Sequence, residues 1–233
     1  MQSHDFKTTN RRGFLGTLAA GAGAIGVASL SAPLRAAAET QSPPSYSDDD
    51  PDAWFAQIKG KHRIVFDTTE PHEIFPFAWP RVFLLTNAAT GTPEKNCSAV
   101  VVLRHEAIPY AMESRLWSKY KFGEMFKIND PVTSSPSVRN LFWQPAPGTY
   151  TVPGIGAVQI GIDELQQSGV MFCACNMAIT VYSAVCAQKA NMDAAEVKKD
   201  FLAGILPGIQ VVPSGVWAVG RAQEHGCNYC FVG

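Results

Sequence analysis

From Trp54 onward, short apolar runs rich in β-branched residues alternate with longer amphipathic stretches. Residues 98–103 are apolar at almost every position, which is typical of a parallel strand buried on both faces. Apolar residues then recur every four positions over 107–120, which predicts a single amphipathic helix. The predicted strands are 62–67, 98–103, 169–175, 209–212 and 227–232, and the predicted helices are 79–89, 107–120, 163–168, 177–189 and 216–225.

This alternation of strands and helices indicates βαβ units. Five strands with crossover helices predict a small α/β domain, a Rossmann-like or flavodoxin-like three-layer sandwich around a mainly parallel five-stranded sheet. Residues 129–161 interrupt the alternation with five prolines and several glycines, and they are too many for a simple connection. We interpret them as an insertion that forms a functional loop or a packed flap.

The first 38 residues have the pattern of a twin-arginine signal peptide. Paired Arg11 and Arg12 precede an apolar pair, and Ala36–Ala38 offers the small side chains that a signal peptidase accepts. The Gly- and Ala-rich stretch between them is weakly apolar for a permanent membrane span, although an uncleaved anchor is the alternative. We therefore predict a periplasmic protein with a flexible linker over 39–53 and one α/β domain over 54–233.

Composition narrows the classes of function. Apolar residues make up 46% of the 233-residue chain and charged residues 17%, values of an ordinary globular protein. The formal net charge is −1, and the basic residues after the leader are scattered among acids. A nucleic-acid partner is excluded because it would require a basic stripe.

Candidate chemistry gathers where predicted strands end. The carboxyl ends of parallel strands face the crevice in which such sheets bind ligands. Cys175 ends the third strand just before a helix, and the partial positive charge of that helix end would stabilise its thiolate and make it a better nucleophile or metal ligand. His105, after the second strand, is a candidate base or metal ligand, and Asp67 ends the first strand in the same way.

A second set of residues suggests a metal ion or an iron–sulfur cluster. Cys227 and Cys230 form a Cys-x-x-Cys pair with His225 beside it, and Cys173 and Cys175 would supply a second pair. Against this, a spacing of three in a regular strand sends Cys227 and Cys230 to opposite faces. Six cysteines in an oxidising compartment also permit disulfides, and buried cysteines are common core residues.

Several segments resemble the DsrE/DsrF-like family. They are His62–Asp67, Val101–His105, Gly169–Phe172, Cys175–Ala178 and Leu206–Gly215, in the family's order and spacing. The resemblance runs from about Lys61 to the end, without the insertion. It implies a small α/β domain in a homo-trimer or homo-hexamer, in which the cysteine matching Cys175 carries sulfur as a persulfide received from, or passed to, a partner protein.

Three hypotheses follow from these patterns. In the first, Cys175 handles sulfur or thiol redox chemistry with the help of His105. In the second, the chain is a non-catalytic binding protein in which Cys173, Cys175, Cys227, Cys230 and His225 hold a metal ion or an iron–sulfur cluster. In the third, the chain is a structural oligomer whose cysteines are disulfides or core residues.

Overall fold

A computed structural model describes residues 50–233. Residues 1–49, which include the predicted signal peptide and most of the predicted linker, lie outside the described residues. The first described helix, α3 (Pro51–Phe55), begins three residues before the predicted domain start at Trp54. Within residues 50–233, no helix is both long and apolar enough to cross a membrane.

The domain is built on five strands that all run parallel. They are β1 (His62–Thr68), β2 (Cys97–Leu103), β5 (Met171–Cys175), β6 (Ile209–Val212) and β7 (Asn228–Val232). Their order across the sheet is β6-β5-β2-β1-β7. The predicted α/β class with a parallel five-stranded sheet is therefore confirmed. Strand order reverses between β1 and β7, the kind of position at which open parallel sheets hold ligands.

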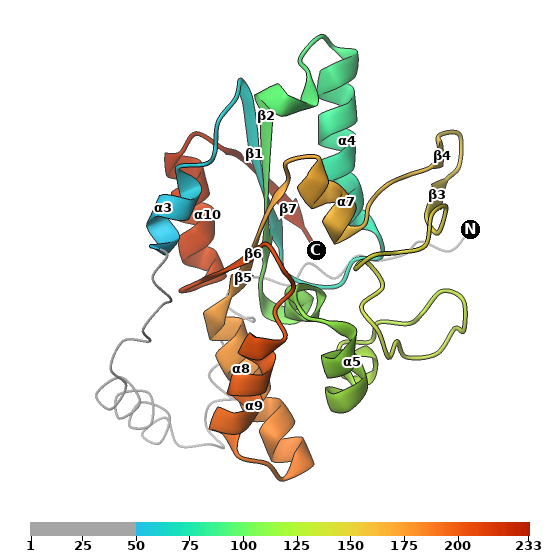
Figure 1. Ribbon diagram of the computed structural model, residues 1–233, viewed down its shortest axis with the longest axis vertical. Helices are drawn as coiled ribbons and strands as arrows, with labels where there is room; N and C mark the ends of the chain where they lie inside the picture. Colours follow the sequence, from blue (N-terminus) through green and yellow to red (C-terminus); the bar gives the residue numbers. More distant parts are fainter. Residues whose placement is uncertain (1–49) are drawn as a thin grey trace, which may run out of the picture. The chain divides into compact units, whose positions relative to one another are not determined.

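Helices cover both faces of this sheet (Figure 1). On one face lie α4 (Phe75–Ala89) and α7 (Ile162–Gln167), and on the other lie α3 and α10 (Gly215–Glu224). Two further helices, α8 (Asn176–Ala190) and α9 (Ala194–Ala203), pack against each other beyond the end of β5. The carboxyl edge of the sheet is therefore bordered by the first turns of α8 and α10.

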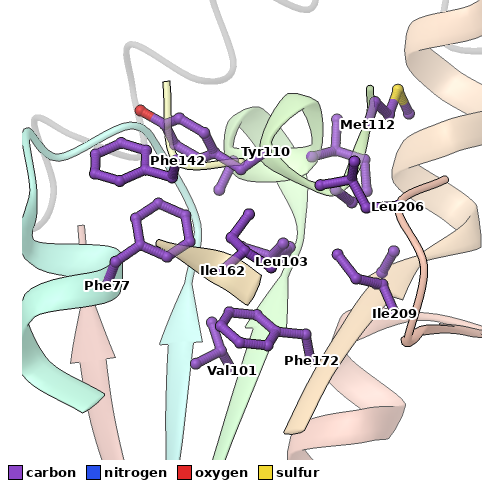
Figure 2. Close-up of a cluster of buried hydrophobic side chains, with 14 of the residues drawn as sticks. Phe77, Val101, Leu103, Tyr110, Met112, Phe142, Ile162, Phe172, Leu206 and Ile209 are labelled. Carbon is purple, nitrogen blue, oxygen red and sulfur yellow. The ribbon is translucent and has the colours of Figure 1, made fainter. Parts of the chain in front are cut away.

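The larger hydrophobic core lies on the α4 face of the sheet (Figure 2). Phe77 of α4 stacks on Phe142 with ring centroids 4.2 Å apart, and Phe142 stacks on Tyr150 at 5.0 Å. Both of those partners come from the predicted insertion, which includes only a two-stranded hairpin, β3 (Thr151–Val152) and β4 (Gly156–Ala157). The insertion thus contributes aromatic side chains to the core.

The predicted single helix over 107–120 is wrong. The chain forms a 3-10 helix, η2 (His105–Ala111), and then a separate helix, α5 (Ser114–Tyr120). The backbone is extended at Met112 and Glu113, and Met112 forms an isolated bridge with Ile205 instead of continuing the helix. Helix α9 was not predicted, nor were the short helices η1 (Glu94–Asn96) and α6 (Phe122–Met125).

Candidate functional site

A cavity of about 370 Å³ opens at the carboxyl edge of the sheet. It lies between the end of β5, the residues that follow β2, and the first turns of α8 and α10. Its lining residues are Arg104, His105, Cys175, Met177, Ala178, Val181, Tyr182, Ser214, Gly215 and Val216. The cavity therefore combines one thiol, one imidazole and one guanidinium with a largely apolar wall.

Cys175 occupies the junction between β5 and α8. It is the last residue of the strand and the N-cap of the helix, and its Sγ accepts a hydrogen bond from the backbone N–H of Ala178 at 3.3 Å. Such a bond is stronger to a thiolate than to a thiol because the acceptor then carries charge. The residue is 6% exposed, and that small exposure faces a cavity.

The turn into α8 also separates Cys175 from Cys173. In a regular strand the two side chains would share a face. Instead, Cys173 packs in the cluster beneath α10, whereas Cys175 contacts the larger core on the other side. Cys173 and Cys175 therefore pack in different clusters of the core, although they are only two residues apart.

His105 lies across the same cavity from a different element. It begins η2 with a φ of 50°, a left-handed conformation uncommon for a residue other than glycine. Its ring lies edge-on to Tyr182 of α8, with centroids 6.3 Å apart. The structure thus brings His105 and Cys175, the two residues proposed for thiol chemistry, to one cavity.

A charged cluster beside the cavity holds Arg104. The guanidinium Nε donates to Asp67 Oδ1 at 2.6 Å, and Nη2 donates to Asp67 Oδ2 at 2.9 Å. Tyr229 of β7 donates its hydroxyl to the same Oδ2 at 2.8 Å. The hydrogen bond to Asp67 raises the pKa of Arg104 despite partial burial, and the negative charge of the Asp67 carboxylate adds to the rise.

Arg104 was missed as a site residue at the level of sequence. Its one signal was its position as a charged residue directly after a buried strand. Asp67 was singled out for the same reason, and the structure shows that it binds this arginine rather than lining the cavity itself.

The five residues proposed for a metal or iron–sulfur site are not brought together within the chain. Cys173 and Cys227 pack in the α10 cluster, whereas Cys230 points to the opposite face. Because β2 and β1 separate β5 from β7, the two cysteine pairs lie about 14 Å apart across the sheet. His225 caps the end of α10 and stacks on Phe55.

In residues 50–233, no group of three or more His, Cys, Asp or Glu side chains is arranged to hold a metal ion. The cysteines and His225 therefore do not fit a metal or iron–sulfur centre formed by one copy of the chain.

All six cysteines fall in the described residues, and all are free thiols. Burial strongly raises the pKa of Cys173 and raises the pKa of Cys186 and Cys227 to about 11. Burial also raises the pKa of Cys97 and Cys230. These five thiols are therefore held in the neutral form at pH 7, where a thiol is a poor nucleophile.

The fold and the cavity together define an α/β protein with a single cysteine in a pocket at the carboxyl edge of a parallel sheet. No protein-family model matches the sequence, and no curated protein matches it. Among solved structures, a distant match is MTH1491, a protein of unknown function from Methanobacterium thermoautotrophicum, with 18% identity and a TM-score of 0.33. That match covers 74% of this chain and 100% of the other.

Proposed function

We propose that this protein accepts and passes on sulfane sulfur as a persulfide on Cys175. The observation that carries the proposal is the position of Sγ: it is on the wall of a cavity and accepts a backbone N–H from the first turn of α8. The motifs shared with DsrE/DsrF-like proteins support the same residue, because a cysteine at the end of the third strand carries the sulfur in several members of that family.

The chemistry requires no outside oxidant. The thiolate of Cys175 attacks the outer sulfur of a donor persulfide, R–S–SH, and the bond between the two donor sulfurs breaks. The pair of electrons in that bond leaves with R–S⁻, so the products are Cys175–S–SH and the donor thiolate. The sulfur is transferred without net oxidation or reduction of the two reactants together. The reverse reaction, with an acceptor thiolate, discharges the protein.

His105 has a supporting role in this scheme. Its imidazole lines the cavity and can donate the proton that converts R–S⁻ into a neutral leaving thiol. The ring of Tyr182, on α8, packs edge-on against the imidazole ring of His105.

The absence of a second thiol in the cavity favours sulfur transfer over dithiol redox chemistry. An intramolecular disulfide cycle needs a resolving cysteine within bonding reach, with Cα atoms about 4.4–6.8 Å apart and side chains that face each other. Cys173 is nearest in sequence, but it packs in the separate core cluster beneath α10 and does not line the cavity. Among the described residues that line the cavity, Cys175 is the only cysteine.

A persulfidation assay tests the proposal. The purified full chain is incubated with a low-molecular-weight persulfide, the bound sulfur is located by peptide mass, and it is quantified as thiocyanate after cyanide treatment. We expect one added sulfur atom per chain, on the Cys175 peptide. Cys175→Ser should abolish it, whereas Cys230→Ser, the matched control at the most exposed of the other cysteines, should leave it unchanged.

The proposal is overturned if the added sulfur sits on another cysteine, or if folded protein takes up none.

Export by the twin-arginine route and assembly into a homo-trimer or homo-hexamer are part of the same proposal. They would place the reaction in the periplasm, with a persulfide-bearing protein or small thiol as its partner.

A further inference from the structure

The cavity that holds Cys175 has a fixed cation on its wall. Asp67 holds Arg104 through two hydrogen bonds, and Asp67 is itself only 3% exposed and receives the Tyr229 hydroxyl. A guanidinium held in this way cannot rotate freely, so its remaining donors have a defined direction before any ligand arrives.

These contacts leave one nitrogen of Arg104 available. Nε and Nη2 are both directed at the carboxylate, so Nη1 lies on the other side of the planar group. Nη1 has no hydrogen-bond partner among residues 50–233, and the Arg104 side chain is 26% exposed. At longer range the negative charge of Asp67 offsets the positive charge of Arg104. Arg104 therefore attracts an anion only when that anion comes close enough to contact Nη1.

The absence of a side chain at Gly215 allows Arg104 to pack closely against the first turn of α10. A Cβ atom at Gly215 would lie 2.5 Å from Arg104 Cδ, so only glycine lets the helix approach the arginine so closely. Ser214 caps this helix by accepting the Trp217 N–H, and the N–H groups of Gly215 and Val216 remain without a helical partner. Gly215 and Val216 line the cavity together with Arg104, so the partial positive charge of this helix end lies beside the arginine.

The rest of the cavity wall complements this polar end. None of its lining residues is acidic. Three apolar side chains on the rim are more than half exposed: Met177, Val181 and Val216. A ligand with an anionic group at one end and a short apolar skeleton would therefore find a partner for each part.

We propose that the cavity selects sulfur carriers that bear a carboxylate or sulfonate, and that Arg104 is the residue that recognises this anionic group. The inference rests on the proposed function and names the substrate class of the same site. The anionic end contacts Arg104 Nη1 and the first turn of α10, which directs the sulfur end toward Cys175.

Charged thiol probes test this selectivity. Methanethiosulfonates transfer an R–S group to a thiolate and release methanesulfinate, so the 2-sulfonatoethyl, 2-hydroxyethyl and 2-trimethylammonioethyl reagents compare an anionic, a neutral and a cationic R group. Rates of modification at Cys175 are read by peptide mass on the native full chain. Relative to their rates with a free thiol, we expect the anionic reagent to be favoured over the cationic one by about tenfold, the effect of one charge-assisted hydrogen bond.

Variants assign the preference to Arg104. Arg104→Gln should reduce the anion preference, read as the ratio of the rates with the anionic and cationic reagents, to near unity. The ratio is the readout because Arg104 lines the same cavity as Cys175, so its loss also affects the rate with every reagent. The matched control is Arg139→Gln, because Arg139 also pairs with one carboxylate, Asp130, but lies in the insertion away from the cavity. This control should retain the preference.

A measurement on the unmodified chain covers the case in which Arg104→Gln fails to fold. Propane-1-sulfonate should slow modification of Cys175 by the neutral reagent, and dimethyl sulfone should not. The inference is overturned if the neutral reagent modifies Cys175 but no anion preference or sulfonate protection is found. If no reagent reaches Cys175 in the folded protein, the proposed function itself fails.

Discussion

The surroundings of its sulfur distinguish Cys175 from the other cysteines. Cys230 is the more exposed residue, yet burial raises its pKa and it does not line the cavity. Cys186 packs within the core, where burial raises its pKa to about 11. Reactivity at this site should therefore follow the hydrogen bond from Ala178 and access through the cavity, rather than total exposure.

The pair formed by Asp67 and Arg104 yields a prediction about stability. Asp67→Asn removes the charge that Arg104 faces and leaves the guanidinium partly buried with a neutral partner. We expect a loss of about 1–3 kcal/mol in the free energy of unfolding, less than the cost of breaking a fully buried pair because Arg104 is partly solvated. Urea unfolding with an unchanged m-value would measure it.

The control for this prediction is Glu224→Gln, which breaks the pair with Arg221 on the surface of α10. Exposed pairs contribute roughly 0–1 kcal/mol, so this variant should unfold close to the parent. Equal losses in the two variants would show that the Asp67 pair has no special structural role.

Among the site residues, only those whose position depends on local sequence could be predicted. Cys175 was found because a buried apolar run followed by a helical pattern places it at a strand end. The role of Arg104 could not be found in the same way, because its orientation depends on Asp67, Tyr229 and Gly215, which are distant in sequence. The metal hypothesis rested on the spacing of the cysteines along the sequence. It could not take account of β2 and β1, the two strands that separate the two cysteine pairs in the sheet.

At the scale of elements, polar contacts of Asp200 connect α9 to α5. Its carboxylate accepts hydrogen bonds from Lys119 Nζ and Tyr120 Oη, each at 2.7 Å, and it pairs with Arg115. Burial alone would raise the pKa of Asp200, but the hydrogen bonds from Lys119, Arg115 and Tyr120 outweigh it and lower the pKa to about 2.

This shift predicts how stability depends on pH. A carboxylate whose pKa is lower in the folded state stabilises the fold above its unfolded pKa of about 3.9 and loses that contribution as the pH falls toward 2. We expect Asp200→Asn to cost about 1–2 kcal/mol at pH 7 and to flatten the stability profile between about pH 4 and pH 2. Urea unfolding across this range, compared with the parent chain, is the measurement, and an unchanged slope would contradict it.

Most of the elements were predictable, and the exceptions have physical causes. All five strands of the sheet were located to within about two residues, because buried parallel strands have nearly continuous apolar runs. The four-residue apolar spacing over 107–120 was a true signal of burial, but extended backbone at Met112 and Glu113 divides the segment into two helices. Helix α9 was overlooked although Asp193 caps it and Val197 and Phe201 form its buried stripe.

At the scale of the molecule, strand order assembles the site. The sequence predicts five parallel strands but not their order, because apolar runs of similar composition do not specify their neighbours. The observed order places β7 beside β1, so Tyr229 reaches Asp67, and it places β2 beside β5, so Arg104 and His105 border the cavity of Cys175. Export and assembly involve residues or copies beyond the described part of the chain and stay predictions.

The most direct test of the central claim is a competition among all six thiols of the native full chain. A small neutral alkylating reagent, iodoacetamide, is applied at pH 7 for increasing times, and the modified cysteines are identified by peptide mass. We expect Cys175 to be modified first, ahead of the more exposed Cys230, with Cys173 and Cys186 protected until the protein unfolds. If Cys230 is modified first and Cys175 stays inert in the folded, reduced protein, then Cys175 is a core residue and the proposed sulfur chemistry is contradicted.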